Sequence, residues 1–198
     1  MVLNSFFGIF FVVLAIIFQK ELRRFFEFLG FLGMKKKNFG PAEDTIKIIV
    51  KTVLHFAEEK TGAIIVFPGR ELIDRHVEGG FLLDGKLSGP LLLSIFDKSS
   101  PGHDGALIVE RDKAKKFAAH LPLSENIQLT KGYGTRHRAA MGLSERTDSL
   151  SLVVSEEKGI ISIVRNGEMK TVSLAEELEK KLVSFFSEKF HKKKLSDY

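Results

Sequence analysis

The residues best suited to chemistry in this 198-residue sequence lie in a short stretch where two arginines flank a histidine. A Gly-Tyr-Gly-Thr turn leads into Arg136, His137 and Arg138. A helix-compatible run extends from Arg136 to Glu145, and Thr135 is its predicted N-cap. The start of a helix presents unpaired N–H groups to an anion, and a guanidinium offers two parallel donors to a phosphate. The stretch predicts a phosphate site, although an Arg-x-Arg pair taken alone is more often an ordinary cap with solvated arginines.

Acidic residues occur in two short motifs, one on each side of this stretch. Asp104 belongs to a His-Asp-Gly-Ala motif that directly precedes an apolar run, and Glu157 ends a Ser-Glu-Glu motif that directly follows one. Taken alone, an Asp-Gly pair is usually a turn and an exposed Glu pair is usually solvated. Carboxylate oxygens are also the ligands that Mg²⁺ prefers. The two motifs are therefore candidates for binding a divalent metal beside the arginines.

Together, these three motifs resemble the diadenylate cyclase domain family, whose members make cyclic di-AMP from two ATP. The residues that carry the resemblance are Asp-Gly-Ala at 104–106, Gly-Thr-Arg-His-Arg-Ala-Ala at 134–140, Val-Ser-Glu-Glu-x-Gly at 154–159, Thr-Gly-Ala at 61–63, Leu-Leu-Leu-Ser-Ile-Phe at 91–96 and Leu-Pro-Leu-Ser at 121–124. The resemblance covers Phe39 to Thr171. The approach through Phe18 to Arg24 is similar to the membrane-anchored branch of that family.

The resemblance implies a reaction in which the 3′-hydroxyl of one ATP attacks the α-phosphorus of another in line, and pyrophosphate leaves. Asp104 is the candidate on the hydroxyl side, where its carboxylate binds metal and orients the hydroxyl or accepts its proton. Gly105 has no side chain, so the ribose can approach the backbone. Arg136 and Arg138 are the candidates for holding the triphosphate and stabilising the departing pyrophosphate. His137 either supports the loop or contacts phosphate, and it completes the predicted catalytic set.

The predicted nucleotide and metal sites extend over all three motifs and two neighbouring segments. The predicted ATP-binding residues are Gly62, Ala63, Asp104, Gly105, Ala106, His120, Leu121, Gly134, Thr135, Arg136, His137, Arg138, Ser155, Glu156 and Glu157. Within this set, His120 is expected to stack on adenine and Ser155 to hydrogen-bond a phosphate. The expected cofactor is Mg²⁺ or Mn²⁺, and its predicted ligands are Asp104, His103 and Glu157.

Several other classes of function lack their sequence signals. The chain has no cysteine, which excludes disulfides and thiolate chemistry, and it contains no Walker A, His-Glu-x-x-His or Gly-x-Ser-x-Gly motif. The net charge of +5 is concentrated partly in the lysine tracts 35–37 and 192–194. No aromatic-rich basic motif accompanies these tracts, so nucleic acid is not an expected partner.

The N-terminal residues 2–18 carry no charge, and their length is near the lower limit for a spanning helix. A membrane anchor is the preferred interpretation, and a signal peptide and a buried helix are the alternatives. The positive charges Lys20, Arg23 and Arg24 follow the apolar run, which predicts that this side faces the cytoplasm. Residues 21–32 continue as an expected amphipathic segment on membrane lipid. The anchored branch that the chain resembles often has three spanning helices, whereas one is visible here, so this is either a one-helix form or a chain that lacks an upstream portion.

The remaining sequence predicts short strands that alternate with helices. Strands are expected at 63–67, 106–110, 115–119, 150–155, 160–165 and 168–172, and helices at 45–60, 88–96, 136–145 and from 173 onward, with a helix and loop pair in 68–85. This order predicts an α/β fold with a single mixed β-sheet flanked by helices, preceded by a transmembrane helix. The expected parts are a membrane anchor and juxtamembrane helix at 1–37, a catalytic domain at 38–173, and a C-terminal helix and basic tail at 174–198.

The predicted function is a membrane-anchored diadenylate cyclase with its catalytic domain in the cytoplasm. One domain carries one set of motifs, yet the product joins two nucleotides twice, so we expect a homodimer of face-to-face protomers that each carry one ATP. A regulatory membrane protein is a further candidate partner. One alternative is a nucleotide-binding regulatory module that has lost turnover, and another is a basic membrane-surface adaptor without a nucleotide site.

Overall fold

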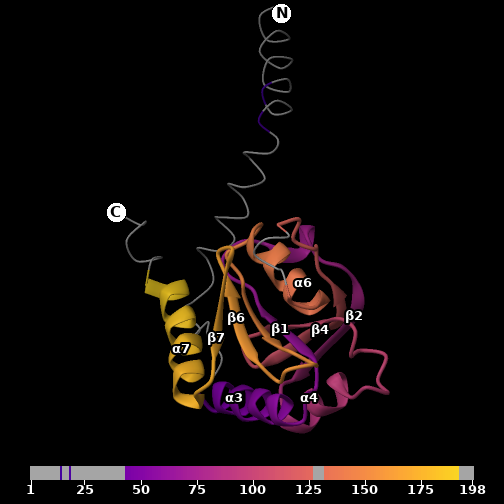
Figure 1. The fold of residues 1–198 in the computed structure, drawn as a ribbon. Helices are drawn as coiled ribbons and strands as arrows, with labels where there is room; N and C mark the ends of the chain where they lie inside the picture. Colours follow the sequence, from indigo (N-terminus) through magenta and orange to yellow (C-terminus); the bar gives the residue numbers. More distant parts are fainter. Residues whose placement is uncertain (1–13, 15–17, 19–42, 127–131, 192–198) are drawn as a thin grey trace, which may run out of the picture. The chain divides into compact units, whose positions relative to one another are not determined.

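A seven-stranded sheet forms the centre of the computed structural model, which describes residues 14, 18, 43–126 and 132–191, with side chains to 188 (Figure 1). The strands are β1 (Ala63–Phe67), β2 (Glu78–Lys86), β3 (Ala106–Glu110), β4 (Lys113–His120), β5 (Leu150–Val154), β6 (Ile161–Arg165) and β7 (Glu168–Val172), in the order β2-β4-β3-β1-β5-β6-β7. β1 pairs in parallel with β3 and antiparallel with β5, and the outer pairs are antiparallel. The predicted single mixed sheet is confirmed.

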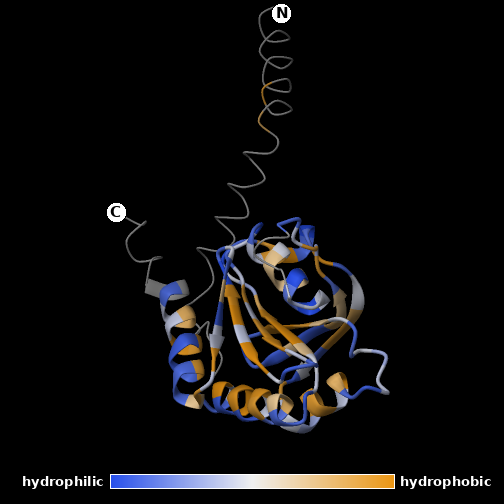
Figure 2. Cartoon of the chain, viewed as in Figure 1, coloured by the Kyte–Doolittle hydropathy of each residue, from blue (hydrophilic) through white to orange (hydrophobic). Residues whose placement is uncertain are grey.

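Helices cover both faces of this sheet, and its central strands are therefore buried on both sides. The helices are α3 (Glu43–Glu58), α4 (Gly89–Phe96), α6 (Thr135–Ser144) and α7 (Ala175–His191), with a 3₁₀ turn η1 (Ile73–Arg75). Ile65 and Phe67 of β1 point into the core that contains α3, α4 and α7. The alternate residues Ile64 and Val66 point into the core beneath α6. In Figure 2 the central strands and α3 are dominated by hydrophobic residues.

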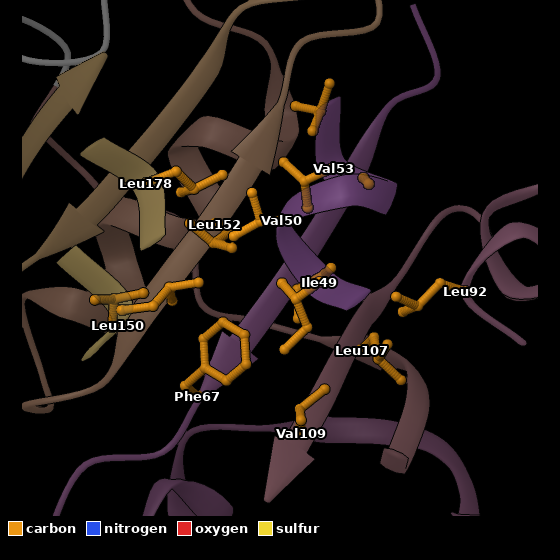
Figure 3. Close-up of a cluster of buried hydrophobic side chains, with 14 of the residues drawn as sticks. Ile49, Val50, Val53, Phe67, Leu92, Leu107, Val109, Leu150, Leu152 and Leu178 are labelled. Carbon is orange, nitrogen blue, oxygen red and sulfur yellow. The ribbon is translucent and has the colours of Figure 1, made fainter. Parts of the chain in front are cut away.

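The first of these cores joins the C-terminal helix to the rest of the domain. Figure 3 shows Ile49 and Val53 of α3 close to Leu152 of β5, with Leu178 of α7 nearby. All four of these side chains are at most 1% exposed. Burial of such a side chain stabilises the fold by about 1.5–3 kcal/mol. The helix expected after residue 173 therefore packs into the same core as the predicted catalytic domain, while Leu174, just before α7 begins, is 68% exposed.

Most predicted elements are confirmed, and the main error is the segment 68–85. The hairpin of β6 and β7 turns at Asn166 and Gly167, which both have positive φ, as a two-residue turn requires. The segment 68–85 was predicted as a helix and loop, but it contains η1 and most of the edge strand β2. Gly79 and Gly80 have positive φ and the register of β2 shifts further along, so its residues do not follow a simple alternation.

The chain divides by residue contacts into two units, an N-terminal one at Met1–Asn38 and a second one at Phe39–Tyr198. The predicted anchor at 2–18, apart from Leu14 and Phe18, and the predicted amphipathic segment at 21–32 lie outside the described residues. None of the helices in the described ranges combines the length and apolar character that crossing a bilayer requires.

Candidate functional site

Five segments that carry predicted site residues meet at one end of the sheet. β1 and β3 are parallel and both begin there, at Ala63 and Ala106. β5 is antiparallel to β1, so its last residue, Val154, pairs with Ala63. β4 ends there as well, since Ala119 pairs with Ala106. Side chains at the start of α6 contact the same end, which is the amino end of the parallel pair rather than the carboxyl end that binds ligands in open parallel sheets.

A cavity of about 570 Å³ opens between the start of α6 and the turn that follows β5. Its lining includes seven of the residues predicted to bind ATP, which are Gly134, Thr135, Arg136, His137, Ser155, Glu156 and Glu157. The cavity is also lined by residues that were not predicted, which are Gly132, Tyr133, Val154, Lys158, Ile160 and Thr171. Tyr133 and Lys158 lie directly beside predicted motifs, so proximity in the chain was the available signal. Thr171 lies on β7, far from every motif, and no sequence signal points to it.

The start of α6 suits an anion, although its cap was predicted at the wrong residue. Gly134 is the N-cap, and Thr135, predicted in that role, is the first helical residue. The carbonyl oxygen of Gly134 accepts hydrogen bonds from the N–H groups of His137 and Arg138 at 3.1 and 3.2 Å. A glycine cap brings no side-chain acceptor for the other N–H groups of the first turn, so these groups are available to a ligand.

Arg136 connects two of the predicted motifs. Its Nη1 donates to Oε2 of Glu156 at 2.8 Å, and its Nη2 donates to the backbone carbonyl oxygen of His103 at 2.9 Å. The Arg136 side chain is 18% exposed. The hydrogen bond from this guanidinium lowers the pKa of Glu156 below its ordinary value. The arginine motif, the Ser-Glu-Glu motif and the His-Asp-Gly-Ala motif are therefore joined through one side chain.

His103 and Asp104 form a pair at the edge of this arrangement. Nδ1 of His103 lies 2.6 Å from the carbonyl oxygen of Ser100, and Nε2 lies 3.2 Å from Oδ1 of Asp104. The Asp104 side chain is 84% exposed. Gly105, the next residue, packs against β4 so closely that a Cβ atom would lie 2.3 Å from the Cα of Ala118. The backbone of β4 thus accounts for the glycine that follows Asp104.

His137 is buried beneath the cavity and remains neutral. Its side chain ring lies 4.9 Å from the ring of Tyr133, and the residue is 4% exposed. Burial, with a smaller contribution from the charge of Lys158, lowers the pKa of His137 to about 4. Its Nε2 is buried and has no hydrogen-bond partner among the described residues. A neutral imidazole cannot provide a positive charge for phosphate at neutral pH, so a structural role or a neutral hydrogen bond remains for it.

The other predicted residues do not line the cavity. These are Gly62, Ala63, His103, Asp104, Gly105, Ala106, His120, Leu121 and Arg138. Gly62 contacts Arg136, and the backbone of Arg138 accepts a hydrogen bond from the N–H of Ser124 at 3.0 Å. Within the described ranges, no three His, Asp or Glu side chains gather as a metal cluster. His103 and Asp104 lie together, and Glu157 does not form a three-ligand group with them.

Comparison with known proteins places the chain in a family. Residues 50–169 match the DAC family, described as "DisA bacterial checkpoint controller nucleotide-binding". The chain belongs to this family. Cyclic di-AMP synthase CdaA of Bacillus subtilis (strain 168) is 40% identical over 153 residues, which are 75% of this chain and 56% of that relative. The chain therefore spans about half the length of the curated relatives that it matches first.

Solved structures support the same membership of the DAC family. The crystal structure of a double mutant of DacA from Staphylococcus aureus has a TM-score of 0.70 at 36% identity and covers 73% of this chain and 96% of that one. A protein from Bacillus cereus described as a hypothetical membrane spanning protein has a TM-score of 0.63 at 41% identity, with coverage of 65% and 63%. The DAC fold therefore extends over most of the described residues.

Proposed function

We propose that this chain is a diadenylate cyclase, which condenses two ATP into cyclic di-AMP and two pyrophosphates. The observation that carries the proposal is the contact between Arg136 and the backbone of His103, which brings the predicted phosphate-binding and hydroxyl-activating motifs to one end of the sheet. Family membership and the 40% identity to a cyclic di-AMP synthase support it.

The start of α6 and the turn after β5 form the proposed triphosphate side. The N–H groups of the first helical turn face an anion without competition from a cap side chain. Arg138 is a proposed guanidinium contact although it does not line the cavity, and Ser155, which does, is the proposed hydrogen-bond donor to a phosphate oxygen. These groups stabilise the negative charge that develops on the departing pyrophosphate. Stabilisation of this charge accounts for most of the lowering of the barrier to phosphoryl transfer.

Asp104 forms the proposed hydroxyl side. Its carboxylate is exposed, so it can accept the proton of a ribose 3′-hydroxyl or orient that hydroxyl for in-line attack. His120, at the same end of the sheet on β4, is the proposed stacking partner of adenine, with Leu121 beside it. The choice of adenine over guanine depends on these two positions and on the resemblance to the family.

His103 and Asp104 have the chemistry of a divalent-metal site. The carbonyl oxygen of Ser100 can only accept, so Nδ1 of His103 is the donor and Nε2 of the neutral ring keeps its lone pair. This lone pair faces a carboxylate oxygen, and two acceptors 3.2 Å apart suit a shared cation. A metal-binding histidine commonly donates its other N–H to a carbonyl. We propose that these two residues hold Mg²⁺ or Mn²⁺, which neutralises phosphate charge when bound.

Catalysis requires a second copy of the chain in this proposal. Each protomer holds one ATP, and each Asp104 serves the hydroxyl directed at the nucleotide of the other protomer. Specific activity should then rise with protein concentration through the dimerisation range. Constant specific activity from a chain shown to be monomeric by sedimentation would contradict the dimer.

The proposed location is the cell membrane, with the cyclase domain on the cytoplasmic side. The uncharged residues 2–18 and the positive charges that follow them support an anchor in lipid. A regulatory membrane protein is a proposed further partner of this segment. Flotation of the 198-residue chain with vesicles, compared with a chain that begins at Phe39, tests the anchor.

Product analysis tests the activity. The chain is incubated with ATP or GTP, each with Mg²⁺ or Mn²⁺, and the products are identified by mass spectrometry. Cyclic di-AMP and pyrophosphate from ATP are the expected products. ATP binding without a cyclic product would support a regulatory module, and the absence of ATP binding would contradict the nucleotide site.

A further inference from the structure

The two arginines of the motif differ in what they contact. Both terminal nitrogens of Arg136 already donate to protein oxygens, one on Glu156 and one on the backbone of His103. No ion pair or side-chain hydrogen bond of Arg138 occurs within the described residues, and Arg138 is half-buried. A guanidinium has five N–H donors. Two of those of Arg136 hold the group against protein oxygens, and its buried Nε has no hydrogen-bond partner within the described residues.

We infer that Arg136 is a positioning residue, which fixes the backbone of His103 and thereby the Asp104 carboxylate. This inference rests on the proposed function for its catalytic consequence. The position of Arg136 itself follows from its protein contacts, which tie the segment before β3 to the turn after β5.

Gly62 provides the space in which the Arg136 guanidinium lies. A Cβ atom on Gly62 would lie 2.4 Å from Nη1 and 2.8 Å from Cζ of Arg136, and 3.1 Å from Cβ of Glu156. Gly62 is not among the glycines with positive φ, so its backbone does not require glycine. The close approach of the guanidinium does require it. This gives Gly62, which was predicted to bind ATP, a role in seating Arg136.

Glu156 provides the charge that keeps Arg136 in this position. A hydrogen bond between a guanidinium and a carboxylate is stronger than one between neutral groups. Its Oε2 accepts from Nη1 while Nη2 points to His103, so the carboxylate fixes the direction of the planar group. Removal of the carboxylate should therefore free the segment that contains Asp104, even though Glu156 is not adjacent to it.

The experiment separates positioning from phosphate binding. Gly62→Ala, Glu156→Ala and Arg136→Ala are compared with Arg138→Ala in kcat, KM and the Kd of a non-reactive ATP analogue. For the first three variants we expect kcat to fall at least tenfold while the Kd of the analogue changes less than threefold. For Arg138→Ala we expect the Kd to rise at least tenfold. A Kd for Arg136→Ala that rises as much as for Arg138→Ala would overturn the inference.

Two further measurements do not depend on turnover. Hydrogen exchange of the amides of residues 102–106 should accelerate in Arg136→Ala and Glu156→Ala, and Glu156→Gln, which keeps an acceptor oxygen, should restore most of the protection. In a double-mutant cycle, Gly62→Ala should add little to Arg136→Ala, because its effect passes through the arginine. Unchanged exchange in Arg136→Ala, or additive losses in the cycle, would contradict positioning. A wild-type chain that makes no cyclic product would instead contradict the proposed function, and the exchange result would still stand.

Discussion

The two sides of the candidate site differ in how firmly the protein holds them. On the α6 side, His137 is 4% exposed and the Arg136 side chain 18%, and the guanidinium is bonded to two protein oxygens. On the other side, the Asp104 side chain is 84% exposed, and its Oδ1 lies 3.2 Å from Nε2 of His103. The first side is built into the fold, and the second is presented to solvent.

The contrast in burial suits one domain to the proposed reaction, which joins two nucleotides. A buried and hydrogen-bonded side can hold a nucleotide by itself, since its groups are already in place before binding. An exposed carboxylate is accessible to a substrate held by another molecule. The contrast therefore agrees with the proposal that Asp104 acts across a dimer interface, and it predicts different results for substitutions on the two sides.

The largest expected effect comes from Asp104→Asn. The amide keeps the size of the side chain but cannot accept a proton or provide the charge for a metal, so we expect cyclic di-AMP formation to fall at least about 100-fold. Because the side chain is exposed, the free energy of unfolding should change by less than about 0.5 kcal/mol. Product assays and urea denaturation measure the two quantities. Asp84→Asn, at an exposed aspartate paired with Lys113 and Lys115, is the control for activity. Full activity of Asp104→Asn would contradict the proposed role of Asp104 in activating the hydroxyl and binding metal.

The buried side should dominate the dependence of stability on pH. His137 has a pKa of about 4 in the folded chain, below its ordinary value of 6.5, because burial disfavours the charged ring. The unfolded chain therefore binds a proton first as pH falls, and stability is lost between about pH 6.5 and pH 4, by at most about 3 kcal/mol. Urea denaturation at several pH values measures this loss, and His137→Gln should show a shallower dependence. Equal slopes in the two proteins would contradict a buried neutral His137.

Gly105→Ala should destabilise the Asp104 side through the backbone of β4. The added methyl would lie 2.3 Å from backbone atoms of Ala118, so β3 and β4 must separate. Overpacking of this kind costs about 1–3 kcal/mol of stability, which thermal or urea denaturation measures. Gly85→Ala on β2 is the matched control, because its nearest neighbour, 3.6 Å away on Leu83, leaves room for a methyl. A similar loss in both variants would show that the contact with β4 is not the cause.

Much of the fold was predictable because the buried strands carry continuous apolar runs. β1 and β3 have the predicted bounds, and the predicted strands 160–165 and 168–172 form the β6–β7 hairpin, which turns at Asn166 and Gly167. β2 was missed because it is an edge strand with two glycines at positive φ near its start and large exposed side chains, such as Leu82 at 85%. Hydrophobic periodicity reports burial, and an edge strand that is mostly exposed does not produce that pattern.

The candidate site was predictable in its residue types but not in its contacts. The order of three motifs indicated which side chains would meet, and seven of the predicted residues line the cavity. The acceptor that fixes Arg136 is the backbone oxygen of His103, and a backbone oxygen has no residue signature. Likewise, the burial of His137 depends on the packing of α6 against the sheet, so its neutral state could not be derived from the Arg-His-Arg spacing.

The smallest expected effect concerns Tyr133, whose ring contacts that of the buried His137. The Tyr133 residue is 39% exposed, and its ring lies 4.9 Å from the His137 ring at an interplanar angle of 42°. Tyr133→Leu keeps an apolar cover but removes the ring contact, which is worth about 0.5–1.5 kcal/mol between aromatic groups. We expect the free energy of unfolding to fall by that amount at pH 7.5 with ATP binding retained. Tyr133→Ala also admits water, so the pKa of His137, followed by NMR of its ring protons, should rise toward its ordinary value. A pKa that stays near 4 in Tyr133→Ala would mean that α6 and the sheet alone keep His137 neutral.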